Sequence, residues 1–398
     1  MSWSSERTSS LTSVETLHDP IPLARDLIRA PSVTPADAGA LDVLQAALES
    51  LGFTCRRYPF GEVDNLYARR GTARPVLAFA GHTDVVPPGR EAAWTHPAFA
   101  AEVDDGTLWG RGAADMKGAI AAFTAAIARF DSQTGGQAGS IAFIITGDEE
   151  GPAIHGTKPL MEALHAEGEH FDHVIVGEPT NPRQIGDTIK VGRRGSLNGV
   201  ITVTGLQGHV AYPDKAANPI PPLLDLLTRL QARTLDDGAP HFQASNLEVT
   251  SIDVDNHAHN VIPETATAKF NIRFNTAHTG DDLKRWIETE ARASGLEFTG
   301  RIALDLKVTG EAFLSTPDWF TDLLSDAVEA ETGNRPARTT GGGTSDARFI
   351  KNYAAVCEFG LVGATMHQVD ERVPVSDVET LTRIYTRVLS GYLRGAGA

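Results

Sequence analysis

The chain has 398 residues, of which 41% are hydrophobic and 22% are charged. This composition is typical of a water-soluble globular protein of two or three domains, and it excludes a disordered, collagen-like or disulfide-rich chain. A net charge of -16 disfavours binding to nucleic acids and to anionic membranes, because like charges repel.

Cysteine usage and the N-terminal segment bear on the compartment. Only two cysteines occur, Cys55 and Cys357, which excludes a disulfide framework or a cysteine-based zinc finger and favours a reducing compartment. No run reaches the roughly 18 apolar residues that a membrane span needs. The N-terminal MSWSSERTSSLTSVETLHDP has no apolar core, so we predict a loose leader, no secretory signal and a cytoplasmic protein.

From residue 21 to about residue 195, short apolar runs alternate with helical patterns. The predicted helices are 21–30, 40–53 and 116–130, and the predicted buried strands are 75–82, 140–146 and 171–178. This alternation predicts an α/β layer in which helices cover both faces of a mostly parallel sheet.

The pattern changes after GRRG (192–195). Strands of alternating polarity and two amphipathic helices follow in the order β-α-β-β-α-β, which is typical of a ferredoxin-like α+β domain. From about residue 309 the α/β pattern returns. We therefore predict one α/β domain, formed by residues 1–194 and 309–398, that is interrupted by an inserted domain at 195–308.

Three of the predicted strands end in polar sequences, GHTD, TGDEEG and VGEPT. In parallel sheets, ligands bind at the carboxyl ends of the strands. His82 and Asp84 form a His-x-Asp pair, in which the Asp side chain can accept the ring N–H and leave the other ring nitrogen for a metal. A purely structural His–Asp pair is the alternative.

Further acids and a second histidine accompany these strand ends. Asp115 precedes a predicted helix, as either an N-cap or a ligand. Glu149 and Glu150 follow an apolar strand; adjacent acids are usually solvated, but burial here would require a cation or a proton. Glu178 follows another apolar strand, and His367 follows AAVCEFGLVGATM. Imidazoles and carboxylates without thiolates suit Zn²⁺, and a carboxylate can bridge two ions, so this set predicts a two-metal site.

The motifs also resemble those of a known family. They are GHTDVVPPG, WGRGAADMKG, TGDEEGPAIHGT, VGEPT, GRRGSL, QGHVAYP, TTGGGTSDARF and TMHQV. Together they resemble the succinyl-diaminopimelate desuccinylases, which are dimeric zinc metallohydrolases related to acetylornithine deacetylase, aminoacylase and carboxypeptidase G. The resemblance extends from about residue 18 to the C-terminus. It implies a zinc-peptidase-like catalytic domain and an inserted domain that mediates dimerisation.

The resemblance also implies roles for individual residues. Two divalent ions are expected, Zn²⁺ or alternatively Co²⁺, with Asp115 as the bridging ligand and a cis peptide bond after it. The other ligands would be His82 and Glu178 for one ion, and Glu150 and His367 for the other. Asp84 would orient His82, Glu149 would act as general base and acid, and His209 would stabilise the oxyanion from the partner subunit of a homodimer.

The implied reaction is hydrolysis of the amide of N-succinyl-LL-2,6-diaminopimelate to succinate and LL-2,6-diaminopimelate, within lysine and diaminopimelate biosynthesis. The implied contacts with this small anionic substrate are Arg193, Ser196, Asn260, Arg273 and Thr344. The sequence departs from the family pattern at Gly363, Ala347 and Asp370, none of which is a predicted ligand. The alternatives are a related N-acyl amino-acid deacylase, such as one acting on acetylornithine, a dipeptidase, or a metal-free binding homologue.

Overall fold

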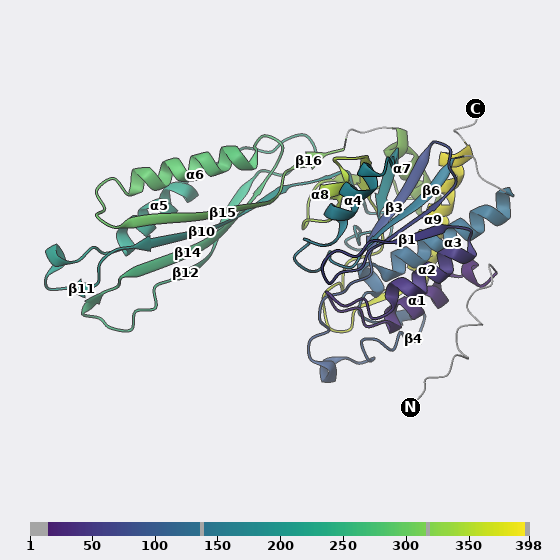
Figure 1. The fold of residues 1–398 in the computed structure, drawn as a ribbon, viewed down its shortest axis with the longest axis horizontal. Helices are drawn as coiled ribbons and strands as arrows, with labels where there is room; N and C mark the ends of the chain where they lie inside the picture. Colours follow the sequence, from purple (N-terminus) through teal and green to yellow (C-terminus); the bar gives the residue numbers. More distant parts are fainter. Residues whose placement is uncertain (1–14, 136–138, 316–318, 395–398) are drawn as a thin grey trace. The chain divides into compact units, whose positions relative to one another are not determined.

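The computed structural model describes residues 15–135, 139–315 and 319–394, and most of the predicted leader lies outside these ranges. The chain divides into two compact units (Figure 1). Unit 1 comprises Met1–Val191, Ser315–Thr339 and Ser345–Ala398, and unit 2 comprises Gly192–Leu314 and Thr340–Thr344. Among the described residues, the helices lack the combination of length and apolarity that would let one cross a membrane.

Unit 1 is built on an eight-stranded sheet with the order β1-β2-β6-β3-β7-β18-β8-β17. At its centre β6, β3, β7 and β18 run parallel, whereas β1 and β2 pair antiparallel at one edge. Every residue of β3 and β6 is buried, as expected for parallel strands that are covered on both faces. The strands are β1 Thr54–Arg57, β2 Leu66–Arg70, β3 Val76–His82, β6 Ser140–Thr146, β7 His173–Val176, β8 Thr188–Lys190, β17 Ala337–Thr339 and β18 Ala355–Glu358.

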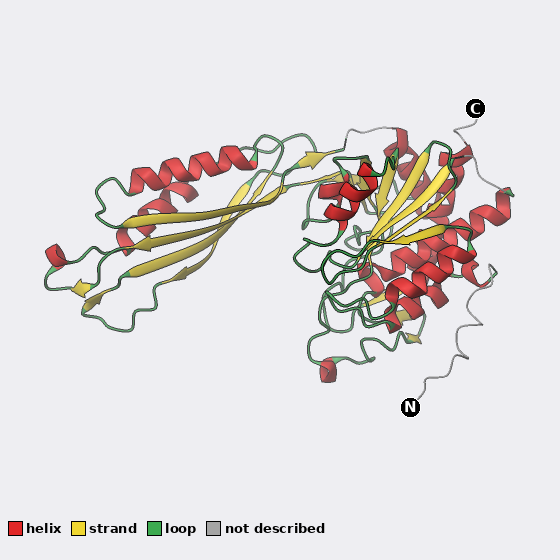
Figure 2. Ribbon diagram, viewed as in Figure 1, coloured by secondary structure: helices red, strands yellow, loops and turns green. Residues whose placement is uncertain are grey.

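Helices flank this sheet (Figure 2). They are α1 Pro20–Arg29, α2 Ala40–Ser50, α3 Gly118–Thr134, α4 Thr157–Ala166, α7 Trp319–Thr332, α8 Ala347–Ile350 and α9 Val375–Arg394. The start of α1 shows local sequence control: Asp19 caps it by accepting a hydrogen bond from the Ile21 amide at 2.9 Å, and Pro20 occupies the first turn. The buried helix α3 packs against α1 and α9.

An aromatic cluster fixes the central strand β3 against these helices. Phe79 of β3 stacks on Phe123 of α3 with 4.6 Å between ring centroids, and Tyr385 of α9 meets Phe123 edge-on at 5.2 Å. The Tyr385 hydroxyl donates a hydrogen bond to the Phe359 carbonyl just after β18. These contacts hold β3 rigidly, and the last residue of β3 is His82.

A second, smaller sheet in unit 1 has the order β19-β5-β4. Its strands are β4 Val103–Asp104, β5 Thr107–Trp109 and β19 Arg372–Pro374. In the antiparallel pair of β5 and β19, Arg372 lies opposite Trp109. This pairing brings the loop that contains His367 beside the segment that contains Asp115.

Unit 2 contains β10 Gly195–Thr204, α5 Ile220–Ala232, β12 Asn246–Asp253, β14 Thr265–Phe274, α6 Gly280–Ser294 and β15 Arg301–Gly310. Its antiparallel sheet has the order β12-β14-β10-β15, which is the ferredoxin-like arrangement. Leu197, Leu226, Phe270 and Ile287 are among the buried residues of its own core. Two short antiparallel pairs complete the unit: β9 Gly192–Arg193 with β16 Phe313–Leu314, and β11 Gly208–His209 with β13 Val261–Ile262.

The predicted fold class is confirmed, with local differences. The helix predicted from residue 116 begins at Gly118, because Asp115 and Met116 have non-helical dihedrals in an irregular turn over Ala113–Lys117. The strands β1 and β2 and the helix α4 were not predicted. For the two strands the reason is visible in the sequence: TCRR and LYARR are short and rich in arginine. For α4 the sequence gives no such reason, because the proline of TKPLMEALHA lies in the first turn, where a helix tolerates it.

Candidate metal centre

Three adjacent parallel strands deliver predicted site residues to one edge of the main sheet. His82 is the last residue of β3, Glu149 and Glu150 follow β6, which ends at Thr146, and Glu178 follows β7, which ends at Val176. Because β6, β3 and β7 are neighbours and parallel, their carboxyl ends meet at the same edge.

Asp115 and His367 reach the same place from loops. Asp115 lies in the irregular turn before α3, and its peptide bond to Met116 is cis. His367 lies in the loop between β18 and β19 and has a left-handed backbone with φ of 61°. A left-handed histidine is uncommon, so the surrounding loop must hold it in this conformation.

Asp115 lies between the two imidazole rings. Its Oδ1 is 3.2 Å from His82 Nε2, and its Oδ2 is 3.1 Å from His367 Nε2. His82 Nε2 is also 3.9 Å from Glu178 Oε1, and His367 Nε2 is 2.8 Å from Glu150 Oε1. The carboxylate of Asp115 therefore presents one oxygen to each histidine, as a ligand shared by two ions would.

Three groups of side chains could hold a metal ion in the part of the chain that the structure describes. They are His82, Asp115 and Glu178; Asp115, Glu150 and His367; and His82, Glu149 and Glu150. In each group the donor atoms lie within 4.8 Å of one another. The first two groups share Asp115 and contain the five ligands proposed from the sequence, which the fold brings together from distant parts of the chain.

The contacts of Asp84 differ from those predicted. His82 Nδ1 donates to the Asp84 backbone carbonyl at 2.9 Å, whereas the Asp84 carboxylate oxygen Oδ1 is 3.7 Å away, too far for a hydrogen bond. The carboxylate instead accepts the backbone N–H groups of Glu149 at 3.3 Å and Glu150 at 3.0 Å. Asp84 thus orients the imidazole through its carbonyl and the two-glutamate loop through its side chain.

This arrangement fits a cation. A carbonyl can only accept a hydrogen bond, so Nδ1 of His82 carries the proton and a neutral ring turns its Nε2 lone pair towards the carboxylates. Two acceptors then face each other across 3.2 Å, which is unfavourable unless a proton or a metal lies between them. The donor set of two imidazoles and several carboxylates is suited to divalent zinc.

The pKa values of the site residues also indicate that the site favours bound positive charge. Burial raises the pKa of Glu149 well above its ordinary value, and Glu178 adds to this rise. Contacts with Asp115 and Glu150 raise the pKa of His367 to about 10. Burial opposes a low pKa at Asp115, but its contacts with His367 and His82 outweigh burial and lower it. Metal binding would therefore displace protons from the imidazoles.

Sequence reasoning missed two residues behind Asp115. Arg111 and Glu371 form an ion pair at 2.7 Å, and their side chains are 3% and 0% exposed. The sequence shows only that Glu371 follows His367 by four residues and that Arg111 precedes Asp115 by four, so each lies near a predicted ligand on its own segment. This spacing gives no sign that the two residues pair with each other.

The residues predicted to contact the substrate belong to unit 2 and fall into two groups. In one, Ser196 of β10 lies opposite Arg273 of β14, and Arg193 Nη1 donates to the Gly343 carbonyl at 2.8 Å, next to Thr344. In the other, exposed His209 and Asn260 lie together near the pairing of β11 with β13. Figure 1 shows β11 and β16 at opposite ends of unit 2, so the two groups are far apart within that unit.

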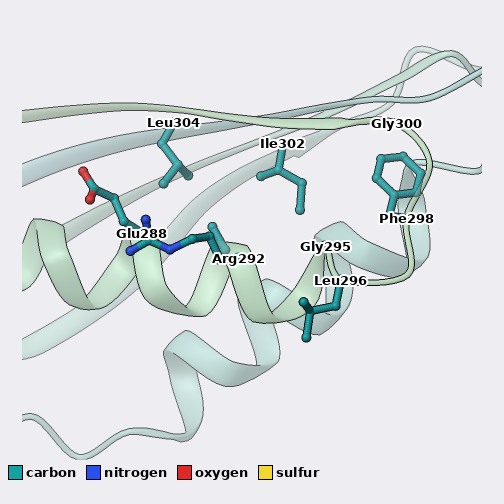
Figure 3. A pocket seen from close by; sticks show the side chains of 9 residues that line it. Glu288, Arg292, Gly295, Leu296, Phe298, Gly300, Ile302 and Leu304 are labelled. Atoms are coloured by element: carbon teal, nitrogen blue, oxygen red, sulfur yellow. The ribbon is translucent and has the colours of Figure 1, made fainter.

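Unit 2 also contains a groove of about 650 Å³ between α6 and β15 (Figure 3). Leu296, Phe298 and Ile302 line it, and its ionisable side chains are Glu288 and Arg292. One acid and one arginine supply neither a ligand set for a metal nor a pair for acid–base catalysis. The candidate site for chemistry is therefore the cluster in unit 1.

Comparison with known proteins agrees with this assignment. The model of peptidase family M20/M25/M40 matches residues 78–391. The chain belongs to this family. A succinyl-diaminopimelate desuccinylase from Maricaulis maris (strain MCS10) is 72% identical over 378 residues, which cover 95% of this chain and 97% of that protein. One from Caulobacter sp. (strain K31) is 59% identical and covers 94% and 96%. The resemblance inferred from the motifs is confirmed.

Solved structures agree with the fold. A tripeptidase from Staphylococcus aureus superposes with a TM-score of 0.76 at 16% identity, covering 95% of this chain and 99% of that chain. A dinuclear metal-binding peptidase of the M20 family from Bacillus subtilis gives a TM-score of 0.71 at 16% identity, covering 96% and 99%. At such identities these likenesses concern the fold alone.

We expect Asp115→Ala to lose both metal ions, because it removes the ligand shared by the two groups. Asp131→Ala is the matched control: Asp131 pairs with Arg70 and belongs to none of the groups. Metal analysis after dialysis of each purified variant checks this expectation. Two tightly held ions in Asp115→Ala would contradict it.

Proposed function

We propose that this chain is a metal-dependent amidohydrolase that cleaves the amide bond of N-succinyl-LL-2,6-diaminopimelate, releasing succinate and LL-2,6-diaminopimelate for lysine and diaminopimelate biosynthesis. The observation that carries this proposal is the 72% identity, over 95% of the chain, to a protein named for that reaction. The clustering of all five proposed ligands supports it, because a metal-dependent hydrolase needs ligands placed so that bound ions can activate water. A cytoplasmic location is part of the proposal and is supported by the low cysteine content, since only Cys55 and Cys357 occur in the sequence.

The proposed metal centre has two positions. His82, Asp115 and Glu178 would hold one ion, and Asp115, Glu150 and His367 would hold the other, with Zn²⁺ preferred and Co²⁺ as an alternative. When bound, two such ions supply a water of lowered pKa and polarise the amide carbonyl. Asp84 keeps His82 in the tautomer that this role requires.

Glu149 is the proposed proton carrier. It is absent from both groups that share Asp115, so its carboxylate is available for chemistry. Burial raises the pKa of Glu149 well above that of an ordinary glutamate, which makes its carboxylate a stronger base. Glu149 would accept the proton of the attacking water and then deliver it to the leaving amine.

Substrate recognition is proposed to depend on unit 2. The substrate carries several carboxylates into a protein of net charge -16, so local cations and hydrogen-bond donors must bind them. Burial and the nearby charge of Arg194 lower the pKa of the Arg273 guanidinium, a situation that an anionic ligand would relieve. The proposed contacts are Arg193, Ser196, Asn260, Arg273 and Thr344.

We further propose a homodimer in which residues 195–308 form the dimerisation domain. In this dimer, His209 would stabilise the oxyanion in the active site of the partner subunit. Ser196 lies near the start of the ten-residue strand β10, and His209 follows the end of that strand. At about 3.3 Å per residue, β10 is about 30 Å long. One small substrate cannot touch both ends of it, so contacts with Arg273 and with His209 would have to come from different chains.

The substrate assignment predicts a preference that can be measured. We expect kcat/KM for N-succinyl-LL-2,6-diaminopimelate to exceed that for N-acetylornithine by at least about 100-fold, because a site built to bind the succinyl carboxylate discriminates against an acyl group without one. Steady-state assays of the metal-loaded protein on both compounds test this. Faster turnover of the acetyl compound would favour the related deacylase.

Glu149→Gln is expected to lower kcat by about 10²- to 10⁴-fold, because the proton carrier is lost while the amide keeps the shape of the side chain. Both metal ions should remain, since Glu149 is not a proposed ligand of either. Kinetics and metal analysis on the same sample check the two halves of this prediction. Loss of metal would mean that Glu149 is a ligand and not the base.

Mixed dimers test whether His209 acts across subunits. His209→Ala and Glu149→Gln proteins should each be nearly inactive, whereas random mixing should restore about one quarter of wild-type activity. Half of the dimers would be mixed, and one of the two sites in each would be intact. The absence of recovery in dimers verified by mass spectrometry would contradict donation from the partner.

A further inference from the structure

The buried carboxylate of Glu371 binds the backbone of the segment that carries Asp115. Its Oε1 accepts the N–H groups of Ala114 at 2.9 Å and of Asp115 at 3.1 Å, and its Oε2 accepts from Arg111 Nη1 at 2.7 Å. Hydrogen bonds to a charged acceptor are stronger than those between neutral groups. Glu371 therefore fixes the backbone of Asp115 directly.

The same pair holds the loop that carries His367. Arg111 Nη1 also donates to the Gln368 carbonyl at 3.2 Å, and the Gly110 amide donates to the Glu371 carbonyl at 2.9 Å. On the far side of the loop, the Asp370 carboxylate accepts from the amide of Thr95 at 2.7 Å and from its hydroxyl at 2.8 Å. These bonds define a loop in which both His367 and Asp370 have a φ of 61°.

The position of the pair makes it unlike the surface ion pairs of this chain. Both side chains are essentially inaccessible to water, so removing one partner leaves the other charge buried and uncompensated. The two residues lie 260 positions apart in sequence. Their pairing therefore joins two loops that no local pattern connects.

We propose that Glu371, supported by Arg111, is a positioning residue that sets the distance between Asp115 and His367 and thereby the affinity for the second metal ion. This inference rests on the proposed two-ion centre. Both positions share Asp115, but they differ in their other ligands: His82 and Glu178 are placed by β3 and β7, whereas His367 lies on the loop that the pair joins to the Asp115 segment. The ion held by Asp115, Glu150 and His367 should therefore suffer most when Glu371 changes.

Metal titration of the Glu371→Gln protein tests this. Gln keeps the shape but loses the charge and one of the two acceptor oxygens. Metal-free wild type and variant are titrated with Zn²⁺ against a competing chelator, and with Co²⁺ while its visible absorption is followed. We expect the second equivalent to bind about 10- to 100-fold more weakly in Glu371→Gln, with a much smaller change in the first.

Glu379→Gln is the matched control. Glu379 of α9 pairs with Arg129 through two contacts of 2.7 Å but lies outside the metal-ligand groups, so both equivalents should bind as in wild type. If Glu371→Gln also binds both equivalents as wild type does, or if both variants weaken equally, the proposal is overturned.

A second variant covers the case in which Glu371→Gln does not fold, as judged by circular dichroism of the metal-free protein. Arg111→Lys keeps the buried positive charge but cannot bond Glu371 and Gln368 with the same geometry, and it too should selectively weaken the second equivalent. Wild-type behaviour of a folded Arg111→Lys would overturn the proposal. These titrations need no substrate, so a wild type that binds two ions but does not hydrolyse the succinyl compound contradicts the proposed function alone, whereas a wild type that binds only one ion contradicts both.

Discussion

Four carboxylates and two imidazoles lie close together at a largely buried edge of the main sheet, and their negative charge has to be balanced. Bringing Asp115, Glu149, Glu150 and Glu178 out of water and towards one another is costly unless cations or protons compensate. The raised pKa values of His367 and Glu149 reflect this cost, because without a metal only bound protons can offset the negative charge. Divalent ions would balance the same charge and at the same time create an activating site for water.

The fold meets this constraint with two kinds of support. His82 ends β3 and Glu178 follows β7, and nearly all residues of these two strands are buried. The positions of His82 and Glu178 are therefore set by the closely packed centre of the sheet. Asp115 and His367 lie on irregular backbone, which by itself would be mobile. Here the buried ion pair of Arg111 with Glu371 and the three-stranded sheet β19-β5-β4 hold that backbone in place. The Glu371 carboxylate also accepts a hydrogen bond from the Ala114 amide.

Asp84 positions two parts of the site at once. Its carbonyl selects the tautomer of His82, and its carboxylate accepts the amides of Glu149 and Glu150. The proposed ligand on β3 and the proposed base after β6 are therefore linked through one side chain. Unit 2 is separate in its core and its sheet, and we propose that it serves recognition and dimerisation and supplies His209 to the partner's site.

Much of this protein could be predicted from sequence because the relevant signals are local. Buried apolar runs ending in GHTD, TGDEEG and VGEPT identify parallel strands and place polar groups at their carboxyl ends, and the β-α-β-β-α-β pattern identifies the inserted fold. The chemical nature of the proposed ligands follows from residue type alone. By contrast, the short strands β1 and β2 owe their structure to pairing with neighbours in the sheet, because their own sequences are too short and too polar to predict it.

The residue types that can bind metal, and the strands that carry them, can be identified from the sequence, since periodicity and composition are properties of neighbouring residues. The contacts cannot: the fold was needed to show that Asp84 reaches His82 through its carbonyl, that Asp115 lies between both histidines, and that Arg111 pairs with Glu371. Each of these depends on the distance between segments far apart in the chain. Such distances are set by the packing of the whole unit and, at Arg111 and Glu371, by the cost of leaving a buried charge unpaired.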